Sequence, residues 1–252
     1  MNTVYFVLGG LWLGLVYFAS AENGNITDFT EYIVNEESQF CDQYYSSCAE
    51  INPSVSGVYK IKVGNDVFDV FCDSTIAGRG WTVFQRRVSD EVNFYRKFSS
   101  YENGFGDLNG SFWLGLDKLY KITSSEPQEL YVHLEDFNGE TAFARYSLFK
   151  VGDVNSQYTL KSLGTYQGTA GDGLANHLNR PFSTFDKDNN RCANFRLGAW
   201  WYKDCQSSNL NALYLGGAFH SDLFGCGVSW HYWRGDVYSL KTVNMMVRPR
   251  AT

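Results

Sequence analysis

Charged residues and prolines are both scarce in this chain. Charged side chains make up 19% of its 252 residues, against the roughly 25% usual in a soluble domain, and there are only 4 prolines. Hydrophobic residues make up 44%, which excludes a disordered chain and suffices for the core of one large domain or two small ones. Because no low-complexity tract interrupts the sequence, we expect its body to fold as one compact unit.

Basic residues are too few for a nucleic-acid-binding protein. The 21 Lys and Arg against 27 Asp and Glu give a net charge of −6, the wrong sign for neutralising a line of phosphates. Catalytic signatures are also missing, since the sequence has no Gly-x-Ser-x-Gly, His-Glu-x-x-His, phosphate loop or dinucleotide fingerprint. The 4 histidines lack metal-ligand spacing, and only His231, set among aromatic residues, could line a site instead of stabilising the core. We therefore predict no enzymatic activity and no nucleic-acid partner.

Long hydrophobic runs are absent except at the N-terminus. Residues 4–18 form an uncharged apolar run, and Ala19-Ser20-Ala21 follows it with the small-x-small pattern of signal-peptidase sites, although no Lys or Arg precedes the run. A membrane anchor is the alternative, but crossing about 30 Å of hydrocarbon takes about 20 apolar residues. We predict a signal peptide over residues 1–21, cleaved after Ala21, and hence a secreted, extracellular protein with no membrane span.

Two sequons and 6 cysteines agree with the secretory route. Asn25-Ile26-Thr27 and Asn109-Gly110-Ser111 predict glycosylation of Asn25 and Asn109. All the cysteines lie after residue 40, and in an oxidising compartment we expect disulfides in place of metal ligation.

The organisation of the chain changes along its length. Residues 22–47 are polar and acidic without heptads, so we expect a short tail and no stalk. Short apolar runs follow that predict strands at residues 57–62, 67–72, 81–87, 129–135 and 142–151, and helices at 112–122 and 174–178. Mixed elements without a βαβ period favour an α+β fold with an antiparallel sheet. From Gly164 onward periodicity is lost over about 75 residues, and we expect the binding site among these loops.

Aromatic residues are what the chain has in excess, with 7 Trp, 17 Tyr and 19 Phe. Four tryptophans in the irregular segment could be sugar-stacking platforms or core residues: Trp200, Trp201, Trp230 and Trp233. In a segment with few strands, large aromatic side chains are expected to build the core.

Seven sequence blocks occur in an order typical of one family. They are SGVY at 56–59, GWTVFQRR at 80–87, GFGDL at 104–108, FWLGLD at 112–117, GAWWY at 198–202, SNLN at 208–211 and YSLK at 238–241. This series closely resembles the fibrinogen-related domain of ficolins, tachylectins, angiopoietins and the fibrinogen chains, and it places that domain at residues 48–252.

The resemblance implies a fold and a disulfide pattern. The fold is α+β, a fibrinogen C-terminal-like globular domain with a small disulfide-linked N-terminal lobe, a central twisted antiparallel sheet with flanking helices, and an irregular C-terminal ligand-binding lobe. The implied disulfides are Cys48–Cys72 and Cys192–Cys205. Cys41 and Cys226 have no family partner, so they pair with each other, or between chains in a homo-oligomer, or Cys226 is a free thiol.

Residues 182–190 resemble the calcium segment of the family, which implies a Ca²⁺ site built on Asp186, Asp188 and Asn190. Carboxylate and amide oxygens at alternate positions of an irregular loop suit this ion. The chain departs from the family because Asn190 replaces an Asp, Arg191 brings a cation, and the loop before Cys192 is about four residues shorter. A weak calcium site and a solvated polar turn are both open.

The family's ligand pocket is an aromatic site beside a cis peptide bond. Carried over by position, the pocket residues here are Arg196, Asp204, Cys205, Gln206, Phe224, Gly225 and Asp236. Of the positions that differ from the acetyl-binding members, only Phe224 keeps its aromatic character. Arg196 and Asp236 replace ring walls, which makes the site polar and opens the option of a salt link between them. We therefore expect altered specificity, for glycans or for acetylated or charged groups.

The resemblance implies one function and one rival. The first is a secreted lectin of innate immunity that recognises glycans or cell-surface glycoproteins on microbial or host surfaces. The rival is a protein-binding signalling or matrix ligand of the angiopoietin type. The altered pocket favours the rival, whereas the secretion signal fits both.

Overall fold

The computed structural model describes residues 15–22, 25–33, 44–188 and 190–250, and the chain divides into two compact units, residues 1–43 and 44–252. In the first unit, strands β1 (Leu15–Glu22) and β2 (Asn25–Ile33) pair as an antiparallel hairpin, with a register shift between Ser20 and Ala21. Cleavage after Ala21, as the sequence predicts, would remove all of β1 except Glu22. Cys41 lies outside the described residues.

An antiparallel sheet forms the centre of the second unit. Along the sheet the main strand order is β10-β9-β8-β16-β5-β4-β3, while β11 pairs with β9, β7 with β5, and β6 with β7. The strands are β3 (Gly57–Val63), β4 (Asp66–Asp73), β5 (Trp81–Arg87), β6 (Phe105–Gly106), β7 (Phe112–Trp113), β8 (Gln128–Glu135), β9 (Thr141–Val151), β10 (Leu160–Ser162), β11 (Tyr166–Gly168) and β16 (Thr242–Pro249). β16 therefore ends the chain between β8 and β5, at the middle of the sheet.

Hydrophobic patterning explains these strands. On β9 the side chains of Ala142, Ala144 and Tyr146 are buried and their neighbours are more exposed, as expected of a strand with one face on the core. On β16 the whole run from Val243 to Val247 is buried. All five strands expected from the sequence are present, and the one expected at residues 81–87 matches β5 at both ends.

The two predicted helices are different in the structure. Residues 112–113 form β7, and helix α3 begins only at Leu116 and runs to Ser125. Gly115 separates the two elements: its φ is 117°, and a Cβ there would lie 3.0 Å from the Asn103 carbonyl oxygen. Leu116, Leu119 and Ile122 then form the buried face of α3, which packs on β9. Residues 174–178 form only a single turn of 3₁₀ helix, η2 (Ala175–His177).

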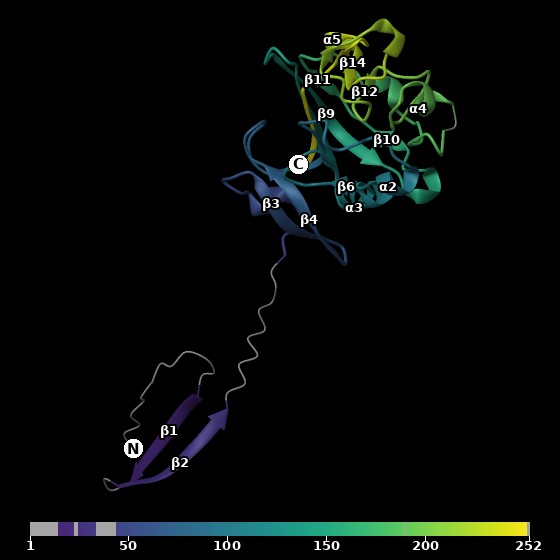
Figure 1. The fold of residues 1–252 in the computed structure, drawn as a ribbon. Helices are drawn as coiled ribbons and strands as arrows, with labels where there is room; N and C mark the ends of the chain where they lie inside the picture. Colours follow the sequence, from purple (N-terminus) through teal and green to yellow (C-terminus); the bar gives the residue numbers. More distant parts are fainter. Residues whose placement is uncertain (1–14, 23–24, 34–43, 189, 251–252) are drawn as a thin grey trace. The chain divides into compact units, whose positions relative to one another are not determined.

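The remaining elements are short. The small N-terminal lobe joins α1 (Cys48–Ile51) to β4 through the Cys48–Cys72 disulfide, α2 (Phe98–Asn103) packs on α3, and η1 (Val154–Ser156) follows β9. We call residues 169–241 the C-terminal lobe. Besides η2 it contains α4 (Cys192–Phe195), β12 (Ser208–Asn209), β13 (Gly217–Ala218), η3 (Ser221–Leu223), β14 (Ser229–Trp230), α5 (His231–Arg234) and β15 (Tyr238–Ser239). In Figure 1 this lobe and the β3–β4 hairpin lie at opposite ends of the second unit.

The tryptophans of the C-terminal lobe belong to the core, as predicted. Trp200, Trp201 and Trp230 are fully buried, and Trp233 is partly buried beneath the Arg234 guanidinium. Trp201 lies with its ring centroid 6.4 Å from that of Trp113 on β7, which joins the lobe to the sheet.

Buried polar side chains make a second connection between sheet and lobe. Arg87 on β5 donates from Nη1 to the carbonyls of Leu210 (3.0 Å) and Ala212 (2.9 Å), and Gln85 donates to the Leu210 carbonyl at 2.9 Å. The Arg87 guanidinium also stacks 3.9 Å from the centroid of the Phe94 ring. Burial lowers the pKa of Arg87 to about 10, which shows that burying this charged group to hold two carbonyls costs free energy.

Among the described residues, no helix is both long and apolar enough to cross a membrane.

Candidate ligand-binding site

Arg196 and Phe224 lie together on the surface of the C-terminal lobe. Arg196 follows α4, and its Nη1 donates to the carbonyl of Phe224, which is 28 residues away in the chain. The guanidinium carbon of Arg196 also lies 5.1 Å from the centroid of the Phe224 ring, and Phe224 is 47% exposed. The pair presents an aromatic face and a cation to solvent, a combination suited to stacking on a ring and to binding an acceptor oxygen.

Gln206 and Gly225 form the floor beside this pair. Gln206 Nε2 donates to the Gly225 carbonyl at 3.0 Å, and Asn209 Nδ2 donates to the same carbonyl at 2.9 Å. Gly225 has a φ of 70°, and a Cβ there would lie 2.1 Å from Gln206 Nε2. A side chain is therefore excluded at this position both by the backbone conformation and by the close approach of the amide.

Asp236 approaches the site from the other side and pairs with His231. The Gly225 N–H donates to the Asp236 carbonyl at 2.7 Å, and His231 Nδ1 lies 2.6 Å from Asp236 Oδ2. The salt link considered for Arg196 and Asp236 is therefore replaced by two separate contacts, Arg196 with a carbonyl and Asp236 with a histidine. His231 therefore contacts one of the residues predicted to form the pocket.

Several polar atoms at this site have unused hydrogen-bonding capacity. Arg196 Nε, Gln206 Oε1 and Asp236 Oδ1 are buried and have no hydrogen-bond partner among the described residues. Such atoms are costly to bury alone, and a bound molecule or water can satisfy them only when the surrounding loops move. The carried-over residues Arg196, Gln206, Phe224, Gly225 and Asp236 are thus brought together by three separate loops.

Asp204 and Cys205 lie next to this group, at a small cavity of 130 Å³. The cavity is lined by Asn176, His177, Lys203, Asp204, Cys205, Gln206 and Ser207. The Asp204–Cys205 peptide bond is trans, whereas the resemblance implied a cis bond there. The Cys192–Cys205 disulfide, predicted from the resemblance, is present and ties this segment to α4.

His177 is the residue at this cavity to which the sequence assigned no role. It is fully buried, its Nδ1 lies 2.7 Å from the Trp201 carbonyl, and its Nε2 accepts from the Ser207 N–H at 3.2 Å. Because Nε2 accepts, the neutral ring carries its proton on Nδ1 and donates to Trp201. Burial lowers the pKa of His177 to about 4. The uncharged ring fixes the backbone that leads into the cavity, and nothing in the sequence around it signals this role.

The three residues predicted to bind calcium already form hydrogen bonds within the protein. Asp186 Oδ1 accepts from the Phe98 N–H (2.9 Å) and the Thr184 hydroxyl (2.7 Å). Asn190 donates to the Tyr202 and Lys203 carbonyls. Asp188 Oδ2 accepts from the N–H and the side-chain amide of Asn194, both at 3.0 Å.

One oxygen among these predicted calcium ligands has no hydrogen-bond partner. Asp188 Oδ1 is buried and unpaired among the described residues, and a carboxylate oxygen of this kind could serve as a calcium ligand. No group of three His, Cys, Asp or Glu side chains gathers anywhere in the described part of the chain. Most ligands of an ion here would therefore be carbonyl and water oxygens.

Cys226 is a free, buried thiol beneath the site, one of the three states the sequence left open. Its Sγ lies 3.3 Å from the Phe195 carbonyl and 3.8 Å from that of Phe224, and burial raises the pKa of the thiol. A bond between chains through this sulfur would first require the lobe to open.

Of the two sequons, Asn109 is exposed and Asn25 is the first residue of β2.

Comparisons with known proteins agree with this architecture. Residues 38–250 match the family described as the C-terminal globular domain of fibrinogen beta and gamma chains. Tenascin-R of Gallus gallus is 45% identical over 203 residues, which are 78% of this chain. The chain spans 14% of the length of tenascin-R, and 45% of human angiopoietin-related protein 6, to which it is 41% identical over 81% of its own length.

Two solved structures share the fold. The fibrinogen-like globe domain of human ANGPTL6 superposes with a TM-score of 0.79 at 41% identity, covering 82% of this chain and 96% of the other. The lamprey fibrin D-dimer, solved with the peptide ligand Gly-His-Arg-Pro-amide, gives a TM-score of 0.76 at 29% identity over 84% of this chain and 77% of the other.

Proposed function

Because this chain belongs to the fibrinogen C-terminal globular domain family, we propose that it is a secreted recognition protein whose C-terminal lobe binds glycans, or acetylated or charged groups, on microbial or host surfaces. Its biological setting in this proposal is innate-immune pattern recognition in the extracellular space. The domain is a binding domain and not an enzyme. The tenascin and angiopoietin-related domains that it matches are likewise binding domains.

The observation that carries the proposal is the exposed Phe224 ring beside unsatisfied polar atoms. A sugar ring stacks its apolar face on an aromatic side chain and uses its hydroxyls as both donors and acceptors. The Arg196 guanidinium can donate to such a hydroxyl, and a small movement of the loops would expose Gln206 Oε1 and Asp236 Oδ1 as acceptors. Binding at one site is expected to be weak and to gain strength when several copies are clustered.

Calcium enters the proposal as a structural ion held near Asp186 and Asp188. Asp188 Oδ1 and the free lone pairs of Asp186 are the side-chain oxygens that would hold it. The ion would stiffen the segment that precedes α4 and so the position of Arg196. Calcium should therefore strengthen ligand binding without contacting the ligand.

A second candidate function has its own support. Phe195 is 65% exposed and Tyr232 is 55% exposed on the same lobe as Phe224, and such aromatic side chains are typical anchors of protein interfaces. The lamprey fibrin D-dimer holds a peptide, so this fold can hold a protein segment. The alternative is a protein-binding signalling or matrix ligand of the angiopoietin type.

Retention on acetylated agarose tests the first function. We expect the purified chain to be retained on acetylated but not on plain agarose, and more strongly with calcium than with chelator. Arg196→Gln should lower the retained fraction about tenfold, since one charge-assisted hydrogen bond is lost, while Arg79→Gln, an exposed arginine between β4 and β5, should not. Equal retention on both resins, unchanged by Arg196→Gln, contradicts the glycan proposal.

Cells distinguish the two functions. Labelled protein should lose binding to cells whose surface glycans have been removed enzymatically if the ligand is a glycan. Binding that survives deglycosylation but is lost on trypsin treatment, and that falls with Phe195→Ala, would favour the protein-binding alternative.

A further inference from the structure

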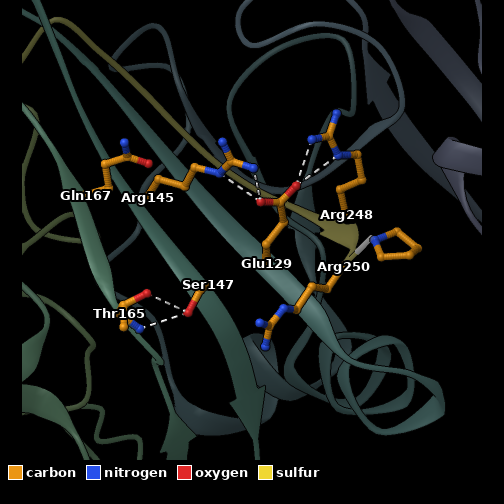
Figure 2. A pocket seen from close by; sticks show the side chains of 8 residues that line it. Glu129, Arg145, Ser147, Thr165, Gln167, Arg248 and Arg250 are labelled. Atoms are coloured by element: carbon orange, nitrogen blue, oxygen red, sulfur yellow. Dashed lines mark hydrogen bonds and ion pairs between the residues drawn. The ribbon is translucent and has the colours of Figure 1, made fainter. Parts of the chain in front are cut away.

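A second concave site lies on the central sheet, outside the C-terminal lobe. It has a volume of 390 Å³ and is lined by Glu129, Arg145, Ser147, Thr165, Gln167, Arg248, Pro249 and Arg250. These residues come from β8, β9, β11 and β16, except that Thr165 directly precedes β11 and Arg250 directly follows β16; Figure 2 shows their side chains around one hollow. None of them belongs to the site described above.

The site is locally basic in an acidic protein. Three arginines face one carboxylate, which leaves a formal charge of about +2 in a chain whose net charge is −6. The Glu129 side chain is only 8% exposed, and its two oxygens are divided between two arginines: Oε2 binds Arg145 Nε at 2.7 Å, and Oε1 binds Arg248 Nη2 at 2.7 Å. Glu129 therefore fixes the orientation of both guanidinium groups before any ligand arrives.

Two cationic groups remain available for a ligand. The Arg145 side chain is 42% exposed and binds Glu129 only through Nε and Nη2. Arg250 is exposed, and its guanidinium has no hydrogen-bond or ion-pair partner among the described residues. In Figure 2 the two groups border the hollow from different sides, with Glu129 between them on the sheet.

Ser147 and Thr165 together supply one hydroxyl donor. Ser147 Oγ accepts from the Thr165 N–H at 2.8 Å and lies 2.9 Å from the Thr165 hydroxyl oxygen. Each hydroxyl has one proton, and only one of the two protons is used in the bond between them, so the other is free for a ligand. The hollow thus presents donors from Arg145, Arg250 and the Ser147–Thr165 hydroxyl pair.

From this arrangement we propose that the hollow binds a sulfate or phosphate ester carried by a saccharide. A tetrahedral oxyanion has three free oxygens pointing in different directions and can accept from three separately placed donors, whereas a carboxylate has two oxygens in one plane. The exposed side chains of Gln167 and Thr165 provide neutral hydrogen-bonding groups at the rim, which suits sugar hydroxyls. The site is separate from the proposed lobe site, so either can fail without the other.

Calorimetric titration of the full-length purified chain tests this site. The probes are a sulfated tetrasaccharide prepared from heparin, its chemically desulfated form, mannose 6-phosphate, and a poly-glutamate peptide of equal charge. We expect the sulfated probe, the phosphorylated probe or both to bind, and the desulfated probe and the peptide to bind at least about tenfold more weakly. Comparing the sulfated and phosphorylated probes identifies which ester the site prefers.

Three variants define where the probe binds. Arg250→Gln should weaken binding about tenfold, because it removes one charge-assisted contact from a side chain that has no structural partner. Arg145→Gln should weaken it at least as much, with thermal unfolding recorded because Glu129 loses a partner. Lys62→Gln removes the same charge from exposed β3, three strands away from β16, and should leave binding unchanged.

Four results would overturn the proposal. They are no binding of either ester at millimolar concentration, equal binding of the desulfated probe, equal binding of the poly-glutamate peptide, and equal loss in Arg250→Gln and Lys62→Gln. Equal binding of the poly-glutamate peptide would assign the hollow to an acidic peptide. Equal loss in the two variants would mean that the probes bind through the overall charge of the protein and not at the hollow. Because the lobe site is also proposed to bind charged groups, Arg250→Gln should weaken binding by the same factor with and without Arg196→Gln, which keeps this test independent of the lobe site.

Discussion

The central sheet and the C-terminal lobe are stabilised by different means. In the sheet, long ladders of backbone hydrogen bonds satisfy the peptide groups, for example the eight paired positions of β16 and β8. In the lobe, strands are two residues long, and scattered backbone hydrogen bonds of turns and loops are supplemented by side chains that bind the backbone. Asn209 holds the Arg196 and Gly225 carbonyls, and Asn211 holds the Ala199 carbonyl. A lobe built in this way depends on a few individual residues, whereas the sheet distributes its stability over many similar ones.

Removing the Arg87 guanidinium should be the strongest challenge to this contrast. We expect Arg87→Met to lower the free energy of unfolding by about 4 kcal/mol, since the Leu210 and Ala212 carbonyls lose their buried donor. Urea unfolding measures the loss, and hydrogen exchange should show faster exchange of lobe amides with little change in β8 and β9. Arg86→Met is the control on the same strand, because Arg86 stacks on Phe71 within the sheet, and it should cost less than about 1 kcal/mol. Equal costs would mean that the lobe does not depend on Arg87.

The two disulfides offer a matched comparison of the regions. They close 24 residues at Cys48–Cys72 and 13 residues at Cys192–Cys205, so chain entropy predicts a similar loss of about 3 kcal/mol when each pair is replaced by alanine. We expect the consequences for binding to differ. Loss of Cys192–Cys205 should weaken retention on acetylated agarose, because this bond positions the Gln206 segment, while loss of Cys48–Cys72 should not. Parallel melting curves and retention assays would reveal any departure from this pattern.

Acid should weaken the lobe before the sheet, through His177. Its folded pKa of about 4 lies below the ordinary value of 6.5, so the unfolded chain takes up a proton first as the pH falls. The contribution of the neutral ring to the free energy of unfolding is complete above pH 6.5 and is lost as the pH falls from 6.5 to about 4. The loss has reached about 2 kcal/mol at pH 5.

Urea midpoints recorded from pH 7 to pH 4 check this prediction. The pH dependence should flatten in His177→Asn and persist in His133→Asn, since burial also lowers the pKa of His133 on β8 but this side chain is only partly buried. A slope that His177→Asn leaves unchanged would assign the acid sensitivity to other groups.

The sequence predicts the sheet better than the lobe, for the same physical reason. Strands such as β5 follow from local patterning, because a strand with a buried face must show it in its side chains. The helix expected at residues 112–122 was wrong at its start because the close approach of Asn103 to Gly115 depends on tertiary structure. Family resemblance supplied both disulfides, which spacing alone could not.

The candidate site could be predicted only in part. Resemblance located the positions of Arg196 and Phe224, but their contacts are made across three loops whose course has no periodicity. The pairing of Asp236 with His231 and the role of His177 also depend on those loops. The basic hollow on the sheet was not predicted, because its arginines are separated by 103 residues in the sequence, from Arg145 to Arg248, and only the order of the strands brings them together.

The buried sulfur of Cys226 can report how often the lobe opens locally. It is the one unpaired thiol in the described part of the chain, and it is covered by the backbone of the residues that form the candidate site. An alkylating reagent can reach it only when Phe195 and Phe224 move apart, so the labelling rate counts openings directly. A ligand that bridges these loops would lower the labelling rate of Cys226 without any change in the closed structure.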